Sequence, residues 1–150
     1  MFAATLTPSQ LDQEIHTRGA KATVQALDRR GMFDTVLDRI ATGNTAWVRL
    51  ASGLAQGTDA GDSTGLTVAL ATALPKNPAV VLAALNDGPV INPAAVCGVP
   101  FIEPSAQEVR EYLDRTIPAV TRVKPSDRVP FRTQCLEALH HIQNPVAGQP

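Results

Sequence analysis

Hydrophobic positions along the chain recur with the 3.6-residue period of α-helices. The run 33–41 is the clearest case, because its apolar side chains fall on one helix face. Two further runs, 64–74 and 78–86, are apolar on nearly every side, which indicates helices buried on every side. No segment alternates apolar and polar residues at period two, so the sequence predicts no β-sheet.

Capping residues mark the ends of these helices. The segments 7–10 and 105–108 each carry a capping-box pattern, and Gly19 and Gly43 are suited to end helices. A helix is therefore expected in each of the ranges 8–18, 20–30, 32–42, 45–56, 64–74, 78–86, 106–120 and 130–142, with a single helical turn at 92–96.

Some boundaries depend on single residues. Asn44 and Asn77 are expected to cap the helices 45–56 and 78–86, since asparagine is a favoured N-cap residue. Asp62 or Ser63 is expected to cap the helix 64–74. Pro118 should kink or end the helix 106–120, because proline lacks the amide hydrogen that a helix interior uses.

A weak internal repeat relates the segments 44–51 and 77–84, which begin 33 residues apart. A period of this length is typical of stacked helical hairpins. The alternative is that Asn-x-Ala is a good helix start that occurs twice. The predicted fold is all-α, with about eight helices in stacked antiparallel hairpins, as a short α-solenoid or an irregular bundle. Residues 1–143 are expected to form a single domain and 144–150 a flexible tail.

Charge is distributed unevenly along the chain. Residues 51–100 carry only Lys76, Asp59, Asp62 and Asp87, so this third is either the buried centre of the fold or a binding surface, and burial is the simpler interpretation. The net charge of −1 gives no reason to expect binding to nucleic acid or to an anionic membrane. The sequence contains no run of 18 apolar residues, so it predicts no membrane-spanning helix.

The two cysteines, Cys97 and Cys135, are candidates for a disulfide that would join a proline-rich loop to the last helix. The alternative is two buried thiols. A periplasmic or secreted location would suit the bridge and is favoured if a signal peptide has been removed, since none is recognisable at Met1; otherwise a cytoplasmic location is expected.

Candidate catalytic and metal-binding patterns are weak. Glu137 and His140 have the Glu-x-x-His spacing of di-iron bundles, but the second copy that such sites need is missing. Asp59 and Asp62 resemble part of a cation-binding loop without its full ligand pattern, and helix capping explains them better. The sequence therefore predicts no catalytic residue, no metal site and no cofactor.

The function predicted from these features is that of a small bacterial, non-catalytic protein-interaction module. Scarce lysine and abundant alanine favour a bacterial gene. One alternative is an immunity or inhibitor protein for a secreted toxin, by analogy of fold alone. Another is a small-ligand carrier or enzyme with a pocket between helices.

The site expected for a partner follows from the order of the hairpins. Alternate connections of stacked hairpins fall on opposite edges, and the connections 57–63 and 87–104 are the longer ones. They carry four carboxylates that form the predicted binding rim: Asp59, Asp62, Asp87 and Glu103. A partner with a basic surface would suit this rim, although helix caps and turns also account for Asp62 and Asp87.

Overall fold

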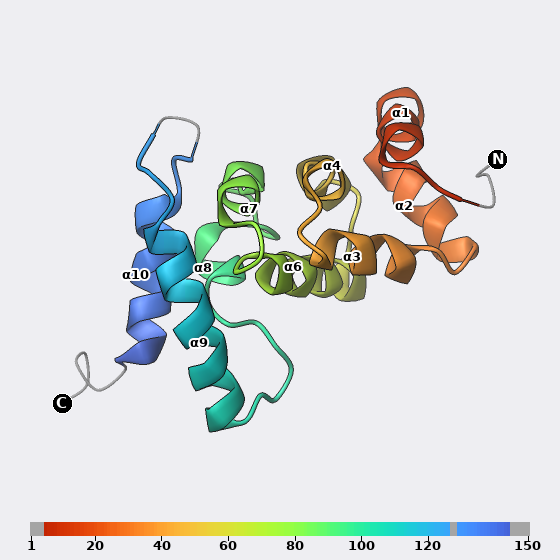
Figure 1. Ribbon diagram of the computed structural model, residues 1–150. Helices are drawn as coiled ribbons and strands as arrows, with labels where there is room; N and C mark the ends of the chain where they lie inside the picture. Colours follow the sequence, from red (N-terminus) through yellow and green to blue (C-terminus); the bar gives the residue numbers. More distant parts are fainter. Residues whose placement is uncertain (1–4, 127–128, 145–150) are drawn as a thin grey trace.

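Residues 5–126 and 129–144 are described by a computed structural model. Every regular element within them is a helix, as the sequence predicts (Figure 1). In chain order the helices are α1 (Pro8–Arg18), α2 (Ala20–Arg29), α3 (Phe33–Ala41), α4 (Thr45–Val48), α5 (Ala51–Ala55), α6 (Ala60–Ala73), α7 (Pro78–Ala84), α8 (Pro93–Val96), α9 (Ala106–Thr121) and α10 (Arg132–Gln143). Of the expected flexible tail 144–150, Asn144 is the C-cap residue of α10 and 145–150 lie outside the described residues.

Local sequence signals set most of the helix ends. Both capping boxes are present, with Thr7 Oγ1 accepting from the Gln10 amide at 3.1 Å and Ser105 Oγ accepting from the Glu108 amide at 3.0 Å. Gly43 follows α3 with φ of 82°, a left-handed conformation that glycine adopts without steric cost. These short-range interactions satisfy amides and carbonyls that a helix end leaves unpaired.

Two boundary predictions were wrong. The helix expected over 45–56 is divided into α4 and α5, because the Leu50 amide bonds to the Trp47 carbonyl three residues earlier, which tightens the chain. α6 begins at Ala60 and not at residue 64, so neither Asp62 nor Ser63 is its N-cap.

Pro118 does not end α9, which continues to Thr121. The Arg122 amide bonds to the Pro118 carbonyl at 3.1 Å, so the turn after the proline keeps its own hydrogen bonding. The helix therefore loses one backbone donor without losing its last turn.

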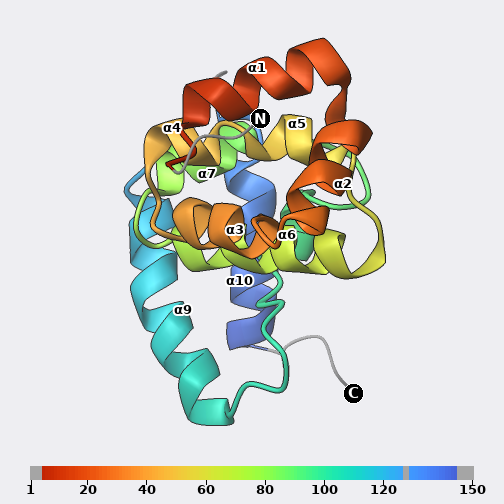
Figure 2. The same ribbon diagram turned by 90° about the vertical axis from the view of Figure 1, so that its right-hand side faces the viewer.

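The helices stack in chain order from α1 to the α9–α10 pair (Figure 1). α3 packs along α6 and α4 packs against α7, an arrangement also visible in Figure 2. The turns after α3 and α6 are joined, since Lys76 Nζ donates to the Ala41 carbonyl at 3.0 Å and Asn77 Nδ2 donates to the Gly43 carbonyl at 2.8 Å. Asn77 thus links the two turns. It occupies the N-cap position of α7, as predicted, but the side-chain capping bond expected from the sequence is not formed.

The C-terminal part of the molecule is tied to the stack by a disulfide. Cys97 follows α8, Cys135 lies in α10, and the two form a bridge with a Cα–Cα distance of 5.3 Å. α10 also packs against both α8 and α9. The bridge therefore fixes the start of the 97–105 loop against the last helix.

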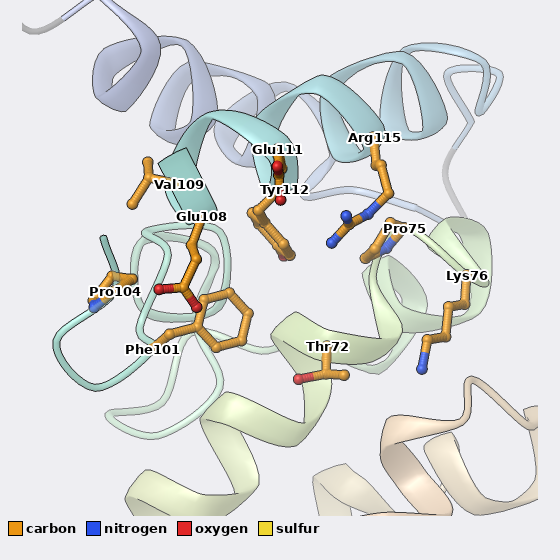
Figure 3. Close-up of a pocket in the computed structure, with 10 residues that line it drawn as sticks. All are labelled: Thr72, Pro75, Lys76, Phe101, Pro104, Glu108, Val109, Glu111, Tyr112 and Arg115. Carbon is orange, nitrogen blue, oxygen red and sulfur yellow. The ribbon is translucent and has the colours of Figure 1, made fainter. Parts of the chain in front are cut away.

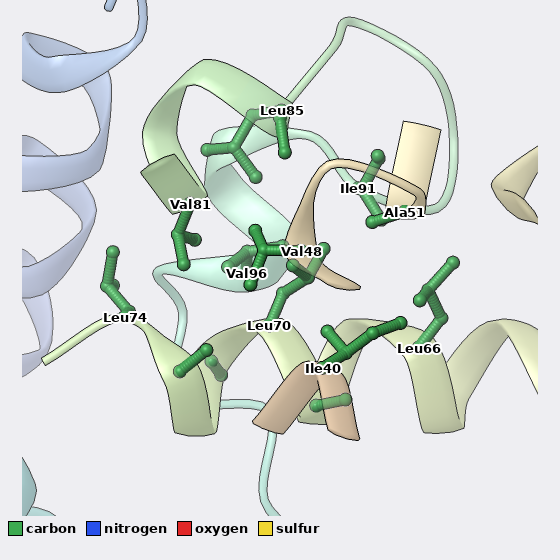
Figure 4. Close-up of a cluster of buried hydrophobic side chains, with 14 of the residues drawn as sticks. Ile40, Val48, Ala51, Leu66, Leu70, Leu74, Val81, Leu85, Ile91 and Val96 are labelled. Carbon is green, nitrogen blue, oxygen red and sulfur yellow. The ribbon is translucent and has the colours of Figure 1, made fainter. Parts of the chain in front are cut away.

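The hydrophobic core is centred on α6 and α7 (Figure 4). Leu66, Leu70 and Leu82 are fully buried, so the charge-poor middle third supplies the centre of the core. The core continues through the neighbouring helices and the 87–104 connection. The amphipathic helices cover this centre with their apolar faces, as their helical spacing predicts.

Candidate functional site

The first candidate site is a cluster of carboxylates that we call the acidic edge, formed by Asp28, Asp34, Asp59 and Asp62. It brings the end of α2 and the start of α3 to the start of α6. Asp28, Asp59 and Asp62 line a small cavity of about 240 Å³ together with Lys21. Two of the four rim residues expected from the sequence therefore lie here.

A close backbone contact positions this edge. A Cβ atom on Gly57 would lie 2.3 Å from the carbonyl carbon of Ala20, so only glycine lets the chain after α5 lie directly on the start of α2. The connection 57–63 is then held by Thr58, whose hydroxyl donates to the Ala55 carbonyl at 3.0 Å and accepts from Ser63 Oγ at 2.8 Å. These contacts fix the carboxylates of α6 beside α2.

The carboxylate of Asp59 is not used to cap the helix. Asp59 occupies the N-cap position of α6, and its backbone carbonyl accepts from the Ser63 amide at 2.8 Å, but its side chain makes no capping bond. The side chain is exposed, and no ion pair joins it to another residue of the described ranges. Its negative charge is therefore available to a partner.

The local environment raises the pKa of Asp62 from 3.8 to about 6. The largest cause is a hydrogen bond with the Asp28 carboxyl, followed by partial burial and by the negative charges of Asp28, Asp59 and Asp34. Like charges that lie close together favour the protonated form of one of them. Within the described residues no ion pair joins these carboxylates to a cation, although Lys21 lines the same cavity.

This raised pKa predicts how stability depends on pH. Between pH 3.8 and about 6 the folded protein holds a proton on Asp62 that the unfolded chain releases, so the free energy of unfolding falls as the pH rises through this window. Asp62→Asn should flatten this slope and should make the protein more stable than the parent at neutral pH. Urea unfolding across the window measures both effects.

Asp114→Asn is the matched control, since it removes one exposed carboxylate from α9, outside the cluster. It should leave the slope of the parent unchanged. Parallel pH profiles for the parent and Asp62→Asn would contradict the assignment of the proton to Asp62.

The other two rim residues lie elsewhere. Asp87 is in an exposed turn in which Asn86 Oδ1 accepts from the Gly88 amide at 2.7 Å. Glu103 lies in the loop that leads to α9, and Figures 1 and 2 both show this loop extending along α9 and away from the start of α6. The structure therefore joins Asp59 and Asp62 to Asp28 and Asp34, which the sequence analysis did not select.

The second candidate site is a cleft of about 630 Å³ between the end of α6, the 97–105 loop and α9, which we call the α6–α9 cleft (Figure 3). Its walls combine aromatic, proline and charged side chains. The residues that matter for its chemistry are Lys76, Phe101, Glu108, Glu111, Tyr112 and Arg115. The sequence analysis did not identify it.

Two aromatic rings form the apolar part of the cleft. Phe101 meets Tyr112 edge to face, with 5.0 Å between the ring centroids. The Tyr112 hydroxyl donates to the Ala71 carbonyl at 2.6 Å, and burial raises the pKa of this phenol. Tyr112 therefore stays neutral and fixes α9 against α6.

The charged side chains of the cleft are separated by sign. Arg115 lies at one end with Lys76, whereas Glu108 lies beside Phe101 at the other end (Figure 3). A second carboxylate, Glu111, lies between them next to Tyr112, and its Oε1 accepts from Gln107 Nε2 at 3.0 Å. No hydrogen bond or ion pair joins Arg115 to another residue in the described part of the chain. The cleft thus has a positive end at Arg115 and Lys76, an aromatic centre at Phe101 and Tyr112, and two carboxylates, one at its far end and one beside the centre.

The weaker patterns of the sequence form no site. Glu137 and His140 are exposed on α10, and His140 Nδ1 lies 3.2 Å from Gln143 Oε1. Within residues 5–126 and 129–144, no group of three or more His, Cys, Asp and Glu side chains is placed to hold a metal ion. Over the same ranges, no helix has the length and apolar character needed to cross a membrane.

Comparison of the chain with protein-family models, with curated proteins and with solved structures found no match. Any functional assignment therefore depends on the geometry of the two sites.

Proposed function

We propose that this protein is a non-catalytic protein-interaction module that binds a basic partner through the acidic edge. The observation that supports the proposal is that Asp28, Asp59 and Asp62 line one cavity, and that no ion pair within the described residues joins them to a cation, Lys21 of the same cavity included. The raised pKa of Asp62 agrees with this grouping of carboxylates. A basic side chain of a partner would relieve this repulsion. Complementary charge of this kind accelerates association and selects the partner.

The shape of the site favours binding over catalysis. A carboxyl group that titrates near neutral pH can act as a general acid or base, but such chemistry needs a pocket that holds a substrate. The cavity at the acidic edge measures about 240 Å³, below the range of about 300–1,000 Å³ that is usual for ligand pockets. Its carboxylates Asp34 and Asp59 are exposed at the surface, where a protein can reach them.

The proposal also predicts a proton linkage. A basic partner would lower the pKa of Asp62, so binding would release a proton and the affinity should weaken as the pH falls below about 6. Screening by salt should weaken the same interaction.

The test uses the double variant Asp34→Lys/Asp59→Lys, which reverses two exposed charges of the edge. A protein that the parent chain captures from lysate is purified, and its binding rates are measured by surface plasmon resonance at low and high salt. We expect the association rate at low salt to fall about tenfold or more, with loss of the salt dependence.

The control reverses Asp114 and Glu137, two exposed carboxylates outside the acidic edge, and should retain the parent rates. The proposal fails if the parent captures no protein or if the edge variant binds at the parent rate in low salt.

A further inference from the structure

The α6–α9 cleft is separate from the acidic edge. The acidic edge lies at the start of α6 and the cleft at its end, and 14 helical residues place them about 20 Å apart. At about 630 Å³ the cleft falls within the size range of binding pockets, and most of its centre is apolar. A ligand here would meet none of the carboxylates of the acidic edge.

The order of residues along α9 sets the dimensions of a ligand. Glu108 and Arg115 are seven residues apart on the helix, which separates them by about 10 Å along its axis. Glu111 and Tyr112 lie between them, with Phe101 against the tyrosine ring. An extended peptide advances about 3.3–3.6 Å per residue, so about three residues span the same distance.

We infer that the α6–α9 cleft binds an extended peptide segment of a partner protein. The segment places a large apolar side chain against Phe101 and Tyr112. An acidic residue pairs with Arg115, and a basic residue about three positions away faces Glu108. The opposite charges at the two ends of the cleft fix which way the segment lies.

Two charged side chains of the cleft, one at each end, are already ordered by hydrogen bonds before a ligand binds. Lys76 Nζ is fixed by its bond to the Ala41 carbonyl, and the Glu108 carboxylate is fixed because it accepts from the Ser105 amide at 3.0 Å. Side chains that are already ordered lose less conformational entropy on binding. Arg115 has no such partner in the described residues, so its guanidinium donors are available to a carboxylate.

The loop that forms one wall of the cleft is held in an uncommon conformation. Val99 has φ of 54° and Glu103 has φ of 46°, on either side of Phe101. Residues other than glycine rarely adopt such values, and those that do are concentrated at binding and catalytic sites. The disulfide at Cys97 fixes the start of this loop, so Phe101 is presented to the cleft on a constrained segment.

The experiment is a selection from a displayed library of random heptapeptides on the full chain, followed by affinity measurements on the selected peptides. We expect enriched sequences with a large apolar residue between an acidic and a basic residue about three positions apart. With Arg115→Glu as the target, the acidic position should change to a basic one. Peptides selected on the parent should then bind Arg115→Glu roughly ten- to a hundredfold more weakly.

Two further variants distinguish the effect of charges inside the cleft from the effect of any charge change on α9. Arg110→Glu makes the same charge reversal at an exposed position of α9 outside the cleft, and should leave the selected sequences unchanged. Glu108→Gln removes the negative end while glutamine can still complete the capping box, and should relax the selection of the basic residue. The acidic-edge variant Asp34→Lys/Asp59→Lys should select the same peptides as the parent, so the two sites are tested independently.

Several results would overturn the inference. These are a selection without enrichment, enriched peptides without the two charged positions, and the same sequences selected on the parent and on Arg115→Glu. Ile102, in the loop beside the cleft, is a large apolar side chain that is 82% exposed, so a second copy of the chain is the competing occupant. A dimer in sedimentation analysis that both Ile102→Asp and Arg115→Glu dissociate would assign the cleft to self-association and would exclude a separate peptide partner.

Discussion

Truncation of Leu70 or Leu82 to alanine should lower the free energy of unfolding by about 2–5 kcal/mol each. Both side chains have no exposed surface, and they lie in α6 and α7, the two helices that the rest of the stack covers. Removal of a buried isobutyl group loses its transfer free energy and leaves a cavity that close-packed neighbours fill only in part. Urea unfolding of the two variants and the parent measures the difference.

The matched control is Ile102→Ala, which removes a side chain of similar size from a position that is 82% exposed. It should change stability by less than about 0.5 kcal/mol, as surface substitutions usually do. A loss below about 1 kcal/mol at both leucines would show that the charge-poor middle of the chain is an exposed face and not the core.

The sequence alone could predict features that depend on neighbouring residues. The capping box at Ser105 and Glu108 and the helix stop at Gly43 need only a few residues to form, and the structure has both. Burial of the leucines in 64–74 and 78–86 was predictable for a similar reason, since an apolar helix packs its large side chains into the core, although Ala79 and Ala83 are exposed.

Other details of the helix starts could not be predicted, because tertiary contacts decide them. α6 starts at Ala60, where the Gly57 backbone packs on Ala20, and no local pattern encodes that contact between residues 37 positions apart. Asn77 occupies the N-cap position of α7 as predicted, but its side chain makes no capping bond there, and its Nδ2 donates to the Gly43 carbonyl in the turn after α3. In both places a long-range contact replaces the local preference.

The two candidate sites illustrate the same limit. Connectivity pointed to Asp59 and Asp62 as members of one edge, but Asp28 and Asp34 join them only because α2 and α3 fold back beside α6. The α6–α9 cleft is assembled from three separate segments, and its Phe101 wall lies in a loop that the sequence marked only as irregular. Charge and aromatic pairs of this kind become visible only when the segments have been placed.

Reduction of the disulfide should lower the free energy of unfolding by about 3–4 kcal/mol. Cys97 and Cys135 are separated by 38 residues in the sequence. The bridge restricts the conformations of the unfolded chain, so its reduction raises the conformational entropy of the unfolded state. The measurement is urea unfolding of one preparation of the full chain with and without dithiothreitol, because reduction changes nothing but the two sulfur atoms. Thiol titration of the unfolded, unreduced protein should find no free thiol.

The matched control for the reductant is the double variant Cys97→Ala/Cys135→Ala, whose stability should not respond to dithiothreitol. Both cysteines are fully buried, so the double variant also loses packing, and its own stability is not a measure of the bridge. Two reactive thiols in the untreated protein would contradict the bridge itself. If the protein has no free thiol but reduction lowers the free energy of unfolding by less than about 1 kcal/mol, the expected entropic contribution of the bridge is wrong. The contacts of α10 with α8 and α9 would then hold the C-terminal helix without the disulfide.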